Sequence, residues 1–218
     1  MTLHFLREVE RLKRMLLDEA TMVEEGLQKA LKALYDNNMQ LAAEVKNSDH
    51  KIDQKEIEIE EEALKILALH QPVASDLRFI ISVIKINNDL ERIGDLTANI
   101  AARTIDIINL PHLNVPGNIV EMADTVLLML KESLDALINL NVKLAAKVCV
   151  DDEKVDLLHK KTFNYVKEKV QTAPQNIDFF LMLMGISRYL ERIADHSTNI
   201  AEDVVYMVEG KISRHRQN

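Results

Sequence analysis

The chain has 218 residues and a formal net charge of −8, with 47% hydrophobic and 28% charged residues. This balance excludes a disordered chain, and the length suits one domain of about 200 residues or two of about 100. Only 5 glycines and 4 prolines are present, which excludes an all-β fold built on many tight turns. The acidic balance argues against nucleic acid as a partner, because phosphate backbones require a basic face.

The single cysteine and the N-terminal segment indicate the cellular compartment in which the protein works. The single cysteine, Cys149, excludes an intrachain disulfide and a four-thiolate zinc site, and it suits a reducing environment. The N-terminal segment becomes charged at Arg7 and lacks the apolar core of a signal peptide. No apolar run approaches the roughly 18 uncharged residues of a membrane span. We therefore expect a cytoplasmic protein without direct membrane insertion.

Three long helices are predicted in the first half of the chain. Apolar residues spaced by three and four predict a helix over residues 3–34, which the polar run 36–38 ends. A second helix is predicted over 41–69. Pro72 ends it, because the residue before a proline avoids helical backbone angles. The third helix covers 75–109, roughly 35 residues or about 50 Å.

The second half of the chain repeats this pattern after a linker. The segment NLPHLNVPGN, residues 109–118, is the clearest linker in the sequence. Helices are then predicted over 119–139, 141–170 and 176–208, with a break at 172–174 between the last two. The sequence therefore predicts six helices in two sets of three.

Matching motifs indicate that the two halves arose by duplication. LERIGDLTANIA, which begins at Leu90, recurs as LERIADHSTNIA at Leu190, an offset of 100 residues. DHKID, which begins at Asp49, recurs as DEKVD at Asp152, an offset of 103. A generic helical pattern explains shared leucines, but it does not explain shared aspartate and asparagine positions in the same order.

The duplication and the short breaks together predict the fold class. It is all-α, with two tandem antiparallel three-helix bundles, six long helices in total, related by internal duplication. The predicted bundles are residues 1–112 and 113–218. With aromatic residues at only 4%, the core is expected to be aliphatic and packed between helix ridges.

Each copy keeps two pairs of carboxylates spaced by four residues, one pair on its second helix and one on its third. Residues four apart lie on one helical face, about 6 Å from each other, and two carboxylates there repel unless a cation separates them. A helical wheel places the third-helix pair largely opposite the core, on an accessible face. If the second and third helices are neighbours, four carboxylates converge in a groove. The residues are Asp49, Asp53, Glu91 and Asp95 in the first copy and Asp152, Asp156, Glu191 and Asp195 in the second.

Such clusters favour a metal site in each copy. Carboxylate oxygens suit magnesium, manganese, calcium, iron or zinc, and a cation would cancel the repulsion among them. His159 and His196 are further candidate ligands in the second copy, although His196 stands where the first copy has Leu96 and is at least as well explained as a packed or exposed histidine. The alternative for the acidic pairs is an ordinary solvated surface.

The doubled motifs, together with HQPVASDLRFIISVIKINNDLERIGD at residues 70–95, resemble the PhoU family of phosphate-uptake regulators over essentially the whole chain. The resemblance implies two three-helix bundles, often in a homodimer. It implies metal clusters on the eight carboxylates, with iron or zinc first and manganese or magnesium as alternatives. It also implies a cytoplasmic negative regulator of phosphate uptake and of the phosphate-starvation (Pho) response. Its expected partners are the ATPase subunit of the phosphate ABC transporter and a sensor histidine kinase.

Two other classes of function compete with a metal-binding regulator. An enzyme is not expected, because no glutamate has a histidine three residues later, as a ferritin-like di-iron site requires, and no phosphate-binding glycine loop is present. A metal-independent helical scaffold or adaptor, whose acidic faces form a docking surface, remains the alternative. Replacing Asp95 and Asp195 by asparagine separates the two: it removes bound metal in one case and weakens metal-free partner binding in the other.

Overall fold

The computed structural model describes residues 3–111 and 113–210, and within these ranges the chain is helical and contains no strand. The helices are α1 (Leu3–Asp36), α2 (Met39–Ser48), α3 (His50–His70), α4 (Ala74–Ile108), α5 (Gly117–Asn139), α6 (Val142–Thr172), the short 3-10 helix η1 (Pro174–Asn176) and α7 (Ile177–Glu209). The predicted breaks between helices are confirmed, and so are the predicted helical segments except the second, which the structure divides. His112, at the predicted boundary between the copies, lies outside the described residues.

One predicted helix is divided. The sequence predicts a single helix over 41–69, whereas the structure separates α2 from α3 at Asp49. Asp49 itself has helical angles, φ −53° and ψ −46°. The amides of Ile52 and Asp53 both donate to its carbonyl oxygen, at 2.8 and 3.3 Å, so the helix resumes at once. The interruption therefore falls on one of the predicted metal ligands.

The duplication is visible in the helix caps. The side chain of Asn38 accepts a hydrogen bond from the amide of Leu41 at 3.0 Å, at the start of α2. Asn141 accepts one from Leu144 at 3.2 Å, at the start of α6. Asparagine is among the best residues for this position because its short side chain satisfies an otherwise unpaired amide. The same break is thus built in the same way at an offset of 103 residues.

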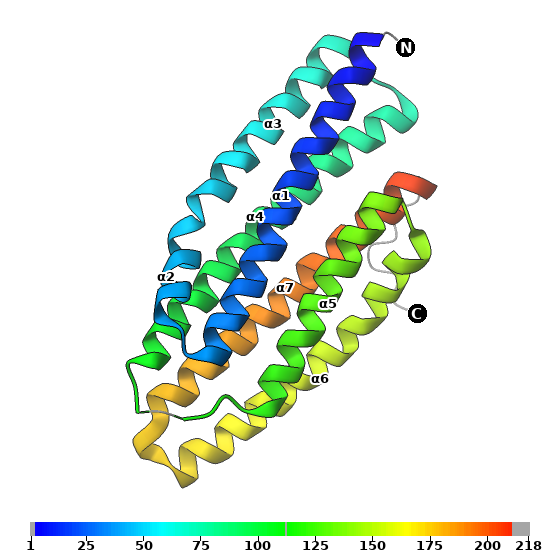
Figure 1. Ribbon diagram of the computed structural model, residues 1–218. Coiled ribbons are helices and arrows are strands. Elements are labelled where there is room, and N and C mark those ends of the chain that lie inside the picture. The colour runs from blue at the N-terminus through cyan, green and yellow to red at the C-terminus, as the bar shows by residue number, and fades with distance from the viewer. Residues whose placement is uncertain (1–2, 112, 211–218) are drawn as a thin grey trace.

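Two three-helix bundles lie side by side (Figure 1). The first bundle consists of α1, α2–α3 and α4, and the second of α5, α6 and α7. Helices α4 and α7 pack against each other in opposite directions along the interface. Lys85 pairs with Asp203 at 3.2 Å. Further along, the side-chain amide of Asn199 donates to the carboxylate of Asp89 at 3.1 Å. Residue numbers rise on one helix as they fall on the other, so the pairing is antiparallel.

The core is aliphatic, as predicted. Leu27 and Ile93 in the first bundle and their equivalents Leu130 and Ile193 in the second are all fully buried. Close packing of such side chains between helices supplies most of the stability of helical bundles. None of the helices in the described ranges combines the length and the apolar character that crossing a membrane would require.

Candidate metal centre

Three of the predicted carboxylates meet in the first bundle. Asp49 lies at the junction of α2 and α3, Asp53 lies one turn further along, and Asp95 lies on α4. Each offers an oxygen within 4.8 Å of the other two. An oxygen-only set of three carboxylates suits hard or borderline cations such as magnesium, manganese, iron or zinc. The predicted convergence of the second and third helices of the first copy is therefore present.

A glycine permits this close approach. Gly94 is buried and precedes Asp95 on α4, directly beneath α3. A Cβ atom at this position would lie 2.9 Å from Cδ1 and 3.2 Å from Cγ2 of Ile52. Both distances are shorter than ordinary van der Waals contacts. The absence of a side chain at Gly94 thus lets α3 pack close enough for its aspartates to reach Asp95.

Glu91 borders this group rather than joining it. Arg92 lies between the two α4 carboxylates, with Nε 3.3 Å from Glu91 Oε2 and Nη1 3.4 Å from Asp95 Oδ2. Burial raises the pKa of Glu91, and the nearby charge of Asp95 raises it further. Glu91, the fourth predicted ligand of the first copy, is therefore repelled by the neighbouring carboxylates, but its own carboxylate lies outside the three-aspartate group.

The acidic row is less accessible than the helical wheel predicts. Only 20% of the Glu91 side chain and 41% of the Asp95 side chain are exposed, because α2 and α3 pack over this face of α4. Burial accordingly raises the pKa of Asp49, and the charges of Asp53 and Asp95 add to the effect. A cation bound among these oxygens would offset both the burial and the repulsion.

Glu19 on α1 is a further acidic residue that the sequence prediction missed. It is fully buried, and neither carboxylate oxygen has a hydrogen-bond partner among the described residues. Burial raises the pKa of Glu19 to about 9, and the charges of Glu56 and Glu91 contribute to the increase. The sequence does contain a sign of this burial. Glu19 falls within the apolar stripe of α1, and the second copy has Met122 at the equivalent position, at the offset of 103.

The second bundle gathers its own four carboxylates less tightly. Burial raises the pKa of Asp152 on α6 to about 6, with further contributions from Asp195, Asp156 and Glu191 in that order. The pKa of Asp195 is also raised, by burial and by Glu191 and Asp156. Among the described residues of the second bundle, however, no three metal-binding atoms come within 4.8 Å of one another.

The two histidines proposed as accessory ligands are engaged elsewhere. Nδ1 of His196 lies 2.8 Å from Asp89 on α4, so this ring joins the interface between the bundles. Nδ1 of His159 lies 2.8 Å from the hydroxyl of Ser187. The contact of His196 favours its alternative interpretation as a packed histidine, and the contact of His159 directs that ring to Ser187.

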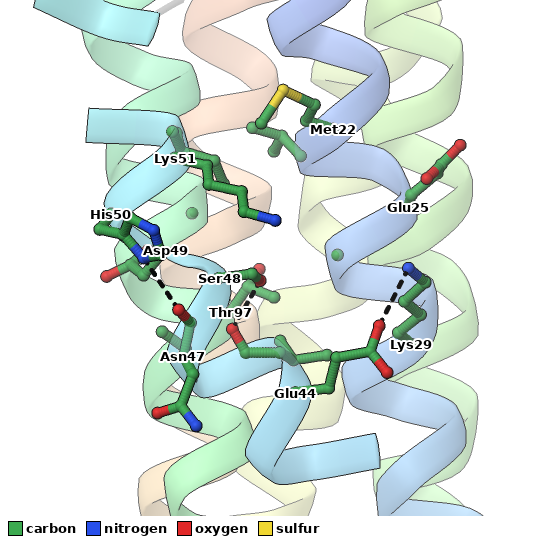
Figure 2. A pocket seen from close by; sticks show the side chains of 16 residues that line it. Met22, Glu25, Lys29, Glu44, Asn47, Ser48, Asp49, His50, Lys51 and Thr97 are labelled. Atoms are coloured by element: carbon green, nitrogen blue, oxygen red, sulfur yellow. Dashed lines mark hydrogen bonds and ion pairs between the residues drawn. The ribbon is translucent and has the colours of Figure 1, made fainter. Parts of the chain in front are cut away.

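A cavity of about 380 Å³ is lined in part by Asp49, one of the three aspartates (Figure 2). It lies among α1, α2–α3 and α4, and Gly26, Asp49 and Gly94 are part of its wall. Lys29 and Glu44 form an ion pair of 3.5 Å at one side, and Figure 2 shows Lys51 extending into the space between α3 and α1. The cavity thus gives small molecules a path to Asp49, one of the predicted ligands of the first bundle.

Comparisons with known proteins agree with the fold and the duplication. The PhoU domain model matches residues 16–104 and again residues 119–204. The "phosphate-specific transport system accessory protein PhoU homolog" of Aquifex aeolicus is 37% identical over 210 residues, covering 96% of this chain and 95% of the relative.

Two solved structures have the same fold. The crystal structure of PhoU from Pseudomonas aeruginosa superposes with a TM-score of 0.91 at 38% identity, covering 95% of this chain and all of that chain. That of the "phosphate transport system regulatory protein PhoU" from Streptococcus pneumoniae has a TM-score of 0.85 at 31% identity, covering 95% and 98% of the two chains. With two matched domains, full-length relatives and the same fold, the chain belongs to the PhoU family.

Proposed function

We propose that this protein is an accessory protein of a phosphate-specific transport system and a negative regulator of phosphate uptake and of the phosphate-starvation response. The observation that carries this proposal is similarity along nearly the whole chain to proteins named as accessory or regulatory proteins of phosphate transport systems. In the cytoplasm, as a homodimer, it docks on the ATPase subunit of the phosphate ABC transporter and on a sensor histidine kinase. When phosphate is plentiful, docking holds the kinase in its inactive signalling state.

Metal clusters on the acidic sets are the second part of the proposal. Iron or zinc is the first choice, with manganese or magnesium as alternatives, because all accept carboxylate oxygens. The convergence of Asp49, Asp53 and Asp95 supports a site in the first bundle. The shared electrostatic field of Asp152, Asp195 and their neighbours supports a site in the second. The clusters shape or bridge the docking surface.

Deletion of the gene tests the regulatory role. Phosphate-starvation genes should become constitutively expressed in high phosphate, and the intact gene supplied in trans should restore repression. The same strain carrying the Asp95→Asn, Asp195→Asn double variant then reports whether repression requires the acidic sets. If the starvation genes remain repressed after deletion, the proposed regulatory role is wrong.

Elemental analysis tests the metal clusters independently of the genetics. Protein purified without chelator should contain bound metal, and the Asp95→Asn, Asp195→Asn variant should lose most of it. A matched control is Asp106→Asn with Asp178→Asn, which removes one exposed aspartate from each of the same two helices, α4 and α7. Equal metal content in the two double variants would remove the acidic sets from the proposal.

A metal-independent scaffold is the second candidate, favoured by one observation. Arg92 already supplies a positive charge between Glu91 and Asp95, as in an ordinary surface ion-pair network. Under this alternative, the acidic faces bind the transporter ATPase or the kinase directly by charge complementarity. Binding to the purified ATPase subunit in excess chelator distinguishes the two candidates: a scaffold keeps its affinity, and a metal-dependent regulator loses it.

A further inference from the structure

A different kind of metal-binding group lies at the far end of the first bundle. His4 and Glu8 are one turn apart on α1, and His70 is the last residue of α3. Helix α1 begins and α3 ends at this end of the bundle (Figure 1). Since α3 begins at His50, beside Asp49, its rise of 1.5 Å per residue places His70 about 30 Å from Asp49 and about 25 Å from Asp53. The group is therefore separate from both acidic sets.

The three side chains converge. One ligand atom from each of His4, Glu8 and His70 lies within 4.8 Å of the other two. Nε2 of His4 is 3.4 Å from Oε1 of Glu8, and Nε2 of His70 is 2.5 Å from Oε2. Two imidazoles and one carboxylate are a recognised set for zinc with a water molecule in the fourth position.

The spacing fits a tetrahedral ion after a small adjustment. With metal–ligand distances of about 2.0–2.2 Å, two ligand atoms of a tetrahedral zinc site lie about 3.3–3.6 Å apart. The distance from His4 to Glu8 already meets this. His70 and Glu8 are at hydrogen-bonding distance, so a metal would replace the shared proton and the two atoms would separate by about 1 Å.

The surroundings hold two of the three ligands in place. Only 9% of the Glu8 side chain and 18% of the His70 side chain are exposed, and the ring of Phe5 packs edge-on against His70 at 5.2 Å between centroids. The His4 side chain is 72% exposed and can close over the ion from the solvent side.

Lys65 is the main competitor for the carboxylate. Its ammonium lies 3.5 Å from Glu8, but it is equally close to Glu62, at 3.4 Å. It can therefore remain paired with Glu62 when Glu8 binds a metal.

The duplicated sequence does not repeat this group. At the offset of 103 residues, the position equivalent to Glu8 is Pro111, in the linker. The group is thus specific to the first bundle and independent of the doubled acidic motif.

We propose that His4, Glu8 and His70 form a binding site for one zinc ion, which ties the start of α1 to the end of α3. The set contains two nitrogen ligands, whereas the acidic sets offer oxygens only. It therefore favours zinc, or cobalt as a spectroscopic substitute, over magnesium and calcium. Binding stabilises this end of the bundle, because the ion joins two helices whose ligands are 62 residues apart in the chain.

Cobalt binding to the full-length Asp95→Asn, Asp195→Asn protein tests the proposal with the acidic sets weakened. Tetrahedral Co²⁺ with nitrogen ligands absorbs visible light far more strongly than octahedral Co²⁺ in an oxygen-only site. Near neutral pH, titration with Co²⁺ should give this strong absorption at one equivalent, and Zn²⁺ should abolish it by displacement.

Variants of the ligands complete the test. His70→Gln should weaken zinc affinity at least about 10-fold, and His159→Gln, which changes a half-buried histidine of the second bundle, should leave it unchanged. Because His4 is exposed, His4→Gln keeps the fold and should also weaken zinc affinity, even if His70→Gln disturbs the helix end. Weak octahedral absorption at saturation, or a zinc affinity that His4→Gln leaves unaltered, would overturn the proposal.

Discussion

The two bundles carry the same acidic motifs over different interiors. The first has Glu19, Gly26 and Gly94 at positions where the second has Met122, Met129 and Ala194. Met122 and Met129 are buried, so the second bundle is filled with apolar side chains where the first has a carboxylate and a cavity. The carboxylate positions are the same in both bundles, while the side chains packed beneath them differ. The arrangement of the carboxylates along the sequence therefore does not depend on one particular core packing.

Two differences between the bundles compensate each other locally. Gly94 packs against Ile52, whereas the equivalent positions in the second bundle hold Ala194 and Val155. One methyl group has moved from one helix to the other, and the total volume is kept. Cores tolerate volume-conserving exchanges of this kind much better than single changes.

An ion pair has also been reversed. Lys29 on α1 pairs with Glu44 on α2 at 3.5 Å. At the same offset, Glu132 on α5 pairs with Lys147 on α6 at 2.5 Å. The attraction between the two helices is preserved with the charges exchanged, so what matters at this point is the pairing and not the sign of either residue.

The largest expected effect on stability comes from Glu19→Met, which gives the first bundle the residue type that the second bundle has at the equivalent position, Met122. The pKa of Glu19 is about 9 in the folded protein and near 4.5 when unfolded, so the native state holds its proton more tightly. Its contribution to the free energy of unfolding is therefore lost as the pH rises from about 4.5 to 9. Metal-free Glu19→Met should gain little at pH 4 and roughly 3–5 kcal/mol near pH 9. Urea unfolding at both values measures this.

The matched control is Glu10→Met, an exposed change on the same helix, which should alter stability little at either pH. If Glu19→Met shows the same small change at pH 4 and pH 9, the carboxylate is hydrated in solution and the contrast between the two interiors is smaller than the structure indicates.

The next effect is at the close contact of α3 with α4. Gly94→Ala should destabilise the protein by about 1–3 kcal/mol, because its Cβ overlaps Ile52 Cδ1. It should also weaken metal binding in the first bundle, since Asp49 and Asp53 flank Ile52. Adding Ile52→Val removes the overlapping methyl group, reproduces the Ala194–Val155 pair and should restore most of the loss. Thermal unfolding and metal titration of the single and double variants check this, and a double variant no better than the single one would contradict it.

A smaller effect on stability is expected from Asp152→Asn, and its sign should depend on whether metal is present. Its pKa is about 6 in the folded protein, above its usual 3.8, so its contribution to stability is lost as the pH rises through this range. Asp152→Asn should therefore stabilise metal-free protein by about 1–2 kcal/mol at pH 8, after allowance for its partial exposure, and by much less at pH 4.

Metal should reverse this result. When a binding cation such as Mn²⁺ is present in excess, Asp152→Asn should be less stable than the parent, because it removes a ligand. Chemical unfolding with and without the metal measures both signs. Stabilisation of equal size in both conditions would mean that Asp152 repels its neighbours without binding a cation.

The smallest effect concerns the reversed ion pair. Both partners of the first pair are largely exposed, so the double exchange Lys29→Glu with Glu44→Lys should change stability by about 0.5 kcal/mol or less. Either single change places like charges together and should cost more than the double exchange. Thermal unfolding of the three variants at low salt completes this cycle, and additive single effects would show that the pair contributes nothing.

The sequence by itself determined the helices, the breaks and the duplication. The apolar spacing that predicts a helix is a property of neighbouring residues, as are the asparagine caps at Asn38 and Asn141 and the proline at position 72. For this reason the segment boundaries could be predicted closely. The interruption at Asp49 could not, because that residue keeps helical angles and carries no breaker signal.

The tertiary structure alone decided which side chains meet. Asp95 joins Asp49 and Asp53 while Glu91 stays to one side, and this depends on how closely Gly94 lets α3 approach. His196 turns to Asp89 because α7 packs on α4, a contact between residues 107 positions apart. A helical pattern fixes the face on which a residue lies, but the angle and separation of two packed helices follow from the shapes of all the side chains between them. Those shapes determine the three-aspartate group and the burial of Glu19.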